Sequence, residues 1–166
     1  MSTIALRPFL PTDAKRCIAI FRASIEEMGS EDYSEDQCEA WKARADDAAA
    51  FATRLSDALT LIASQDGADV GFASLKGKSE LDMLYVDPAY SRRGIGAALV
   101  DALSRLAEAR GAESVISDVS DTAKPLFERQ GFVAQRRNLA ALGDEWLGNT
   151  TMKKTFAKAA APTTHH

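Results

Sequence analysis

The sequence predicts a single α/β (α+β) domain in which helices cover both faces of a mixed, mostly antiparallel central sheet. Three observations support this fold class. The chain has 166 residues, its apolar pattern changes repeatedly between the helical and the strand period, and no linker or internal repeat divides it. A chain of this length can bury enough surface to fold around one core. The composition, 46% hydrophobic and 27% charged, is that of an ordinary globular protein.

The N-terminal segment predicts a strand and then a helix. Residues 3–9 alternate between apolar and polar side chains, as a half-buried strand does. Thr12 or Asp13 then supplies an N-cap. Beyond the cap, apolar residues recur at helical spacing at Cys17, Ile20, Phe21 and Ile25. We expect this helix to end near residue 28.

Two more helices are expected before the pattern changes to strands. Ser34, with Gln37 three residues later, forms a capping-box pattern at the start of a helix that contains Trp41. Residues 46–58 are consistent with a third helix. The apolar period then changes to two, and Gly-containing turns separate three strands that predict an antiparallel meander, at residues 59–64, 70–75 and 80–86.

The second half of the chain alternates between helices and strands. A long helix is predicted up to Gly111, with one apolar face marked by Ile95, Leu99, Ala102, Leu103 and Leu106. A strand and a short helix follow, at residues 114–119 and 121–130. Pro125 is tolerated in the first turn of that helix, where an N–H has no intrahelical partner. Residues 132–140 and 145–156 predict two final strands.

Charge and composition exclude several function classes. The formal net charge of −4, from 20 Lys plus Arg and 24 Asp plus Glu, argues against a nucleic-acid binder. No apolar run approaches the roughly 20 residues of a membrane span, and no signal-peptide layout opens the chain, so we expect a cytoplasmic protein with no membrane partner. Cys17 and Cys38 lack metal-ligand spacing, and His165 and His166 end the chain, so no metal is expected.

The stretch from Tyr85 to Leu103, YVDPAYSRRGIGAALVDAL, carries the main functional signal. Gly94 and Gly96 stand at the start of a helix, where N–H groups have no intrahelical partners. The N–H groups of residues 92–97 could therefore form a cradle for a pyrophosphate. A tight turn in which the glycines serve only packing is the alternative.

Two other phosphate-binding motifs do not fit. A dinucleotide fingerprint needs a third glycine where Leu99 stands, and the glycines do not directly follow a strand. A P-loop ending at Gly77-Lys78-Ser79 fails because Gly71 is one residue too far upstream and a strand follows instead of a helix.

These residues resemble the acyl-CoA signature of the GNAT superfamily of N-acetyltransferases, in which Gln/Arg-x-x-Gly-x-Gly/Ala follows a strand and an x-Pro turn. A second stretch, SDTAKPLFERQGF, resembles the family's next motif, a helix that carries Ala and an aromatic residue and ends in Gly-Phe. The similarity covers most of residues 4–156. It implies a GNAT-like acetyltransferase domain at residues 1–156, followed by a flexible C-terminal tail at residues 157–166.

The resemblance implies acetyl-CoA as the co-substrate, with its pyrophosphate on the cradle and its pantetheine arm along the preceding strand. The cofactor-binding residues that it implies are Leu84, Tyr85, Val86, Ser91, Arg92, Arg93, Gly94, Ile95, Gly96, Ala97, Ser120 and Phe127. Ser91 departs from the family's Gln or Arg, and Arg92 and Arg93 are expected to compensate. Phe127 stands where many members place a Tyr hydroxyl near the sulfur. Water, Tyr33, Tyr85 and Tyr90 remain alternatives for that acid.

Acetyl transfer to an amine also needs a base and an oxyanion donor. Glu80 and Asp82 are the candidate catalytic carboxylates, because we expect both to share a strand face with Leu84 and Val86. The resemblance favours Glu80, since some members keep a catalytic glutamate there. The backbone N–H of Val86 could hold the oxyanion. Solvated carboxylates at the start of the strand are the alternative.

The acceptor is inferred from the segment Glu26–Asp36, which carries six acids and no base. The resemblance places the segment between the first two helices beside the acceptor, so Glu31, Asp32 and Tyr33 are expected to bind a small cationic amine. A solvated acidic loop is the structural alternative. An acyl-CoA-binding module without turnover and a protein or peptide N-acetyltransferase are the functional alternatives. A homodimer is one option for the assembly.

Overall fold

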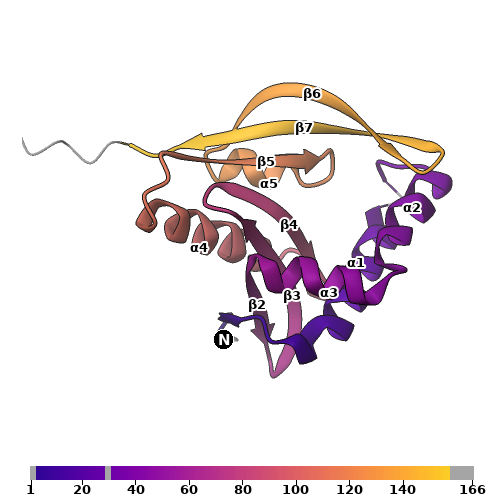
Figure 1. Ribbon diagram of the computed structural model, residues 1–166, viewed down its shortest axis with the longest axis horizontal. Helices are drawn as coiled ribbons and strands as arrows, with labels where there is room; N and C mark the ends of the chain where they lie inside the picture. The colour runs from indigo at the N-terminus through magenta and orange to yellow at the C-terminus, as the bar shows by residue number, and fades with distance from the viewer. Residues whose placement is uncertain (1–2, 29–30, 158–166) are drawn as a thin grey trace, which may run out of the picture.

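The computed structural model describes residues 3–28 and 31–157, which form one seven-stranded sheet with helices on both faces (Figure 1). The strands are β1 (Ala5–Pro8), β2 (Leu59–Gln65), β3 (Ala68–Lys76), β4 (Glu80–Val86), β5 (Ser114–Ser120), β6 (Val133–Leu142) and β7 (Glu145–Thr155). The helices are α1 (Ala14–Met28), α2 (Glu35–Lys42), α3 (Ala48–Asp57), α4 (Ile95–Ala109) and α5 (Lys124–Arg129), with short 3-10 turns η1 (Pro11–Asp13), η2 (Ala43–Ala45) and η3 (Pro88–Tyr90). The tail expected at residues 157–166 lies outside the described residues, Ala157 excepted.

The strands and helices expected from the sequence all form, and the predicted fold class is confirmed. Ser34 caps α2 by accepting the Gln37 N–H, and the Gln37 side chain accepts the Ser34 N–H in return. The predicted apolar face of α4 is wrong at one position. Leu106 is 37% exposed, whereas Ala107 is fully buried, because the contact stripe continues from Leu103 in steps of four.

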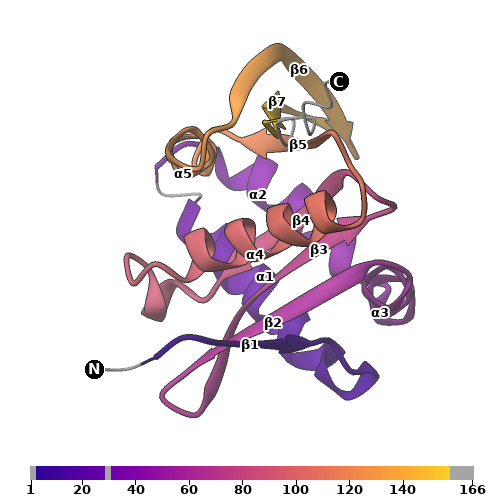
Figure 2. The same cartoon turned by 90° about the vertical axis from the view of Figure 1, so that its left-hand side faces the viewer.

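The two faces of the sheet carry separate hydrophobic clusters. One cluster joins the sheet to α4 and α5 and includes Leu99 and Phe127. The other joins the opposite face to α1, α2 and α3 and includes Phe21 and Trp41. Figure 2 shows α4 in front of the central strands and α1 behind them. No helix in the described ranges is long and apolar enough to cross a membrane.

The sheet order is β1-β2-β3-β4-β5-β7-β6, and its weak point lies between β4 and β5. These parallel strands pair at one position only, Glu80 with Ile116. Beyond it the strands diverge, so the sheet falls into a β1–β4 half and a β5–β7–β6 half (Figure 1). The divergence leaves main-chain groups of β4 without a neighbouring strand on that side.

A bulge in β4 changes the face on which its side chains lie. Leu75 pairs with Leu81 but Ser74 pairs with Met83, so Asp82 is an extra residue in β4. After the bulge, Tyr85 packs with Met83 in the α1–α3 cluster, whereas Leu84 and Val86 pack on the α4 side. The expectation that Glu80 and Asp82 share a face with Leu84 and Val86 is therefore wrong, because the extra residue reverses the alternation.

Candidate active site

Two cavities open where β4 and β5 separate. One, of about 210 Å³, lies between these strands and reaches α4 and α5; we call it the cleft cavity. The other, of about 260 Å³, lies between the same strands, the β6–β7 hairpin and the α2–α3 layer; we call it the helix-side cavity. They share the lining residues Trp41, Leu81, Asp82, Tyr85, Asp118 and Ser120. Ligands in the two cavities could therefore meet at β4.

The cleft cavity brings together six of the residues predicted to bind the cofactor. They are Leu84, Tyr85, Val86, Gly96, Ser120 and Phe127. Phe127 is 2% exposed and packs edge-on against Phe132, with 5.0 Å between ring centroids. Its ring therefore belongs to the core as well as to the cavity wall. The other predicted residues, from Ser91 to Ile95 together with Ala97, lie in the β4–α4 loop and at the start of α4.

The β4–α4 loop presents unpaired N–H groups. The first hydrogen bond of α4 runs from the Ala98 N–H to the Gly94 carbonyl at 3.0 Å. Within the described ranges, the N–H groups of residues 92–97 have no acceptor. Arg92 and Gly94 adopt left-handed conformations with φ of 62° and 82°. Such residues turn successive N–H groups toward one side, and the arrangement suits an anion.

The two glycines of this loop are needed for different reasons. A Cβ on Gly94 would have no atom within 4 Å, so there glycine serves the left-handed backbone. A Cβ on Gly96 would lie 2.9 Å from Leu126 Cδ2, so there glycine lets α4 approach α5. Gly94 is therefore required by the backbone conformation of the loop, and Gly96 by the packing of the helices.

The two arginines of the loop differ in availability. The Arg93 guanidinium lies 5.0 Å from the centroid of the Tyr90 ring and 3.4 Å from Gln65 Oε1, with Asp66 at 3.6 Å. Arg92 is exposed and has no side-chain partner in the described part of the chain. The cation free to compensate for Ser91 is therefore Arg92.

The backbone of Val86 has a donor directed into the gap between β4 and β5. The Asp87 N–H donates to the Val70 carbonyl of β3 at 2.8 Å. N–H directions alternate along a strand, so the Val86 N–H points away from β3 and toward β5. The Val86 N–H is therefore a candidate donor to an oxyanion, and this role stays a prediction.

Asp82 is held in an ion pair. Arg54 Nε and Nη2 donate to its two carboxylate oxygens at 2.9 and 2.8 Å, and the Asp82 side chain is only 11% exposed. A carboxylate with both oxygens bound to a guanidinium is poorly placed to accept a proton. The prediction that Asp82 acts as a base therefore lacks support in the geometry.

Two other carboxylates line the helix-side cavity. Glu80 is half-buried and makes no hydrogen bond or ion pair with any described residue. Asp118 lines both cavities and accepts the Thr151 hydroxyl at 2.6 Å. The sequence analysis missed Asp118. The alternation in β5, which buries Val115 and Val119, already places Asp118 on the opposite face, but only the tertiary fold shows that this face lines a cavity.

Tyr85 stands between the two cavities. The Trp41 indole N–H donates to its hydroxyl at 3.2 Å, and the Phe21 ring packs edge-on with 4.7 Å between centroids. Burial raises the pKa of Tyr85 to about 12, so its phenol is protonated at neutral pH. Since the bond with Trp41 uses an oxygen lone pair, the O–H of Tyr85 is free to donate.

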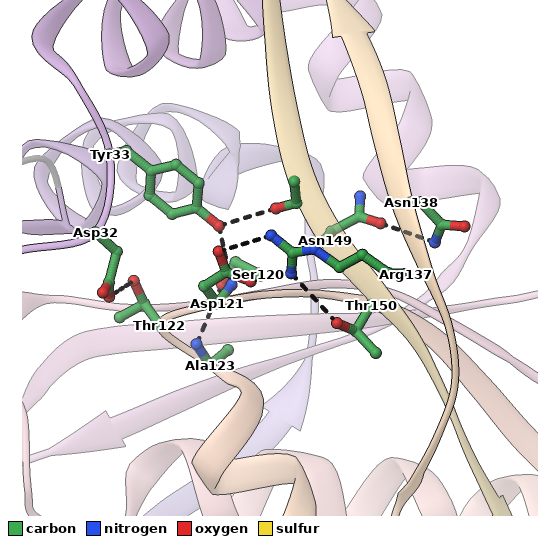
Figure 3. Close-up of polar contacts among 11 residues, drawn as sticks. Asp32, Tyr33, Ser120, Asp121, Thr122, Ala123, Arg137, Asn138, Asn149 and Thr150 are labelled. Atoms are coloured by element: carbon green, nitrogen blue, oxygen red, sulfur yellow. Dashed lines mark hydrogen bonds and ion pairs between the residues drawn. The ribbon is translucent and has the colours of Figure 1, made fainter.

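Only one residue of the predicted acceptor-binding trio lines the helix-side cavity. Tyr33 does, and its hydroxyl donates to the Gly148 carbonyl at 3.2 Å and accepts the Asp121 N–H at 2.9 Å (Figure 3). Asp32 instead accepts the Thr122 hydroxyl at 2.6 Å, and Glu31 is exposed. Neither Glu31 nor Asp32 lines this cavity, so their expected contact with the acceptor stays a prediction.

Comparison with known proteins identifies the family. The model of the acetyltransferase (GNAT) domain matches residues 30–156. The chain belongs to this family. This GNAT enzyme is 33% identical over 154 residues to the uncharacterized N-acetyltransferase YafP of Escherichia coli K12, covering 92% of this chain and 97% of YafP.

Solved structures resemble the whole domain of this GNAT enzyme. A GCN5-related N-acetyltransferase from Rhodopseudomonas palustris is 55% identical, with a TM-score of 0.91 over 94% of this chain and 98% of its own. The PaiA N-acetyltransferase of Thermoplasma acidophilum, solved with coenzyme A, is 22% identical, with a TM-score of 0.78 over 93% of this chain and 99% of its own. The second likeness concerns the fold alone.

Proposed function

We propose that this GNAT N-acetyltransferase moves the acetyl group of acetyl-CoA to a small primary amine by direct attack in a ternary complex. The observation that carries the proposal is the meeting of two cavities at β4. One cavity reaches the start of α4 at Gly96, and the other contains Glu80, which makes no hydrogen bond or ion pair with a described residue. A donor and an acceptor bound in the two cavities would meet at Tyr85, which lines both.

The cleft side fits acetyl-CoA. The N–H groups of residues 92–97 and the Arg92 side chain would hold the pyrophosphate. Four or five charge-assisted hydrogen bonds, at about 1.5 to 3 kcal/mol each, outweigh a helix-dipole contribution of roughly 0.3 to 1 kcal/mol. Leu84 and Val86 would flank the pantetheine arm, and Phe127 would form the apolar wall near its end. The bound thioester supplies the acetyl group and a thiolate leaving group.

The helix-side residues would handle the protons. An alkylammonium has a pKa of about 10, so the acceptor must lose a proton before its nitrogen attacks. Glu80 would accept that proton, directly or through a water. The Val86 N–H would bind the oxyanion as the C–N bond forms and the C–S bond breaks. Tyr85 would give its proton to the departing sulfur in place of the tyrosine that Phe127 replaces. It would regain a proton from the nitrogen, which loses its second proton as the amide forms.

The acceptor is small and cationic at its reacting end in this proposal. The helix-side cavity, at about 260 Å³, lies just below the range of ligand cavities, which span roughly 300 to 1,000 Å³. This favours a small amine over a peptide segment. Glu80 and Asp118, instead of the acidic loop, supply the negative charge for an ammonium.

The cytoplasm is the compartment that we propose for this reaction. Cys17 and Cys38 are both free and buried, which is compatible with a reducing environment. Burial raises the pKa of the Cys17 thiol to about 12, so this thiol takes no part in the chemistry.

The test is a panel of primary amines with detection of free CoA thiol, run beside thermal unfolding with acetyl-CoA. We expect CoA release that depends on the amine, and a raised melting temperature with acetyl-CoA alone. A protein that is stabilised by acetyl-CoA but releases no CoA above the hydrolysis blank with any amine would be a binding module, the second candidate. The observation that favours this candidate is Phe127, which has no hydroxyl and stands where many members of the family place a Tyr.

A further inference from the structure

The helix-side cavity has charges of opposite sign on opposite walls. Its sheet wall carries Glu80 and Asp118. Its helical wall carries Arg44, on the η2 turn between α2 and α3. The remaining charged lining residues, Arg54 and Asp82, neutralise each other through two hydrogen bonds. Two carboxylates and one guanidinium are therefore left to act on a ligand.

Arg44 is not used by the fold. It is exposed, and its side chain makes no hydrogen bond or ion pair within residues 3–28 and 31–157. Its charge still acts on Tyr85 in the cavity wall, because the nearby charges of Arg44 and Arg54 oppose the rise that burial causes in the pKa of Tyr85. By contrast, Arg22 and Arg16, on the adjacent α1, are held in ion pairs with Asp46 and Asp87.

We infer that the acceptor is a small zwitterion, a primary amine that carries a carboxylate on the same apolar frame, and that Arg44 binds the carboxylate. The inference rests on the proposed function and adds the substrate class. The ammonium would dock against Glu80 and Asp118, and the carboxylate would accept hydrogen bonds from the Arg44 guanidinium. An amino acid with an apolar side chain has this distribution of charge.

The uncharged walls are suited to the side chain of the ligand. Tyr33 and Trp41 lie edge-on with 5.4 Å between ring centroids, and both line the cavity together with Leu142 and Leu147. Such walls favour an apolar or aromatic side chain on the carbon that carries the two charged groups. A diamine fits less well, because its second ammonium would approach Arg44.

The test uses pairs of acceptors that differ only by the carboxylate: phenylalanine against phenylethylamine, and tryptophan against tryptamine. The wild-type protein should prefer the zwitterion of each pair in kcat/KM. Arg44→Ala should lower the ratio for each pair by about tenfold, the lower end for a charged hydrogen bond that water partly screens. The loss should be in KM more than in kcat, because Arg44 would bind the carboxylate and not the reacting atoms.

Charge reversal and a matched control sharpen the test. Arg44→Glu should lower the ratio further than Arg44→Ala, because it places a carboxylate against a carboxylate. Arg105→Ala removes one arginine charge from α4, on the opposite face of the sheet, where the side chain is 79% exposed and pairs with Asp101. It should leave the ratio unchanged. Equal kcat/KM for both members of each pair in the wild type, or a ratio that Arg44→Ala does not change, would overturn the inference.

Failure of the proposed function is distinguishable from failure of this inference. If no compound is acetylated, the proposed function fails, and the pairs are then compared by thermal shift of the CoA-saturated protein. The inference predicts a larger shift with the zwitterion, lost in Arg44→Ala but kept in Arg105→Ala. Equal shifts within each pair would overturn it.

Discussion

The two cavities on either side of β4 are built from different kinds of groups. The cleft side presents main-chain groups: one continuous stretch, from Leu84 to Ala97, supplies a strand edge and a row of N–H groups without an acceptor in the described part of the chain. The helix-side cavity presents side chains that come from several separate elements, among them Arg44, Glu80 and Asp118. This difference would allow one fold to keep acetyl-CoA as its acetyl donor while the amine that accepts the acetyl group changes. Side chains can be exchanged on the helix side without altering the backbone that holds the donor.

The largest effect is expected from Phe127, where cleft and core share one side chain. Phe127→Ala should destabilise the protein by about 3 to 5 kcal/mol, because a ring that is 2% exposed leaves a cavity. This corresponds to a fall in melting temperature of roughly 6 to 20 °C for a chain of this size. It should also weaken acetyl-CoA binding, measured by titration calorimetry below the melting range.

Phe132→Ala is the matched control for that variant. Phe132 is 3% exposed and contacts the Phe127 ring, but it does not line the cleft cavity. Its loss should destabilise the protein by a similar amount and leave acetyl-CoA affinity nearly unchanged. Equal losses of affinity in the two variants would mean that Phe127 acts only through stability.

The next largest effect is expected at Glu80 in the helix-side cavity, where a substitution should lower activity without weakening acetyl-CoA binding in the cleft cavity. Glu80→Gln should lower kcat/KM by about 100-fold or more, as loss of a general base does, with the thermal shift from acetyl-CoA intact. The defect should be largest near neutral pH and shrink toward pH 10, roughly the pKa of the ammonium, where the amine is already neutral. Asp118→Asn tests the second carboxylate. A decrease below about threefold for both variants would exclude a carboxylate base.

The elements that support both sides were predictable, because local patterns determine them. The Ser34–Gln37 capping box, the alternation in β2 and β3, and the glycines at the start of α4 each act within a few residues. The six predicted residues that line the cleft cavity were implied by the resemblance to two short GNAT motifs. A site made of main-chain groups depends on spacing along the chain, and spacing is visible in the sequence.

The helix-side cavity was predicted less well because its geometry depends on tertiary contacts. One extra residue at Asp82 reverses the side-chain alternation in β4, and no residue type near it signals the bulge. Arg54 and Asp82 are 28 positions apart and pair only in the fold. The acidic loop stood out by composition, but neither Glu31 nor Asp32 lines the cavity. Arg44 and Asp118 had no local pattern that could single them out.

A smaller effect tests the N–H groups of residues 92–97 as the binding site of the pyrophosphate. Gly94→Ala should cost about 1 to 2 kcal/mol, because Ala is strained at a φ of 82°, and relief of that strain should move the N–H groups of the loop out of their common arrangement. The wild type should gain about 2.7 kcal/mol from acetyl-CoA at 100 times its Kd, or roughly 5 to 10 °C, and this variant should gain little.

The other end of α4 provides the control for Gly94. Gly111 has a φ of 92°, and a Cβ there would also have no atom within 4 Å. Gly111→Ala should show a similar loss of stability but the full shift with acetyl-CoA. If Gly94→Ala keeps the full shift as well, the pyrophosphate does not bind at the assigned N–H groups.

The smallest effect concerns an ion pair that lies outside both cavities. Arg137 on β6 pairs with Asp121 in the loop after β5 (Figure 3), and its hydrogen bonds hold the pKa of Asp121 below its ordinary value of 3.8. A lowered pKa stabilises the fold above pH 3.8, and the contribution is lost as pH falls below that value. The melting-temperature advantage of wild type over Asp121→Asn should therefore shrink below pH 3.8. A difference that stays constant across a series from pH 7 to pH 2.5 would contradict this.

A crystal structure with CoA bound tests most directly the central claim, that donor and acceptor meet across β4. The account predicts the pyrophosphate on the N–H groups of residues 92–97 and the thiol at the junction of the two cavities. The sulfur should lie within about 4 Å of the Phe127 ring, the distance of apolar contact, with the helix-side cavity open beside it. A pyrophosphate bound elsewhere, or a sulfur more than about 8 Å from Phe127, twice that contact distance, would contradict the claim.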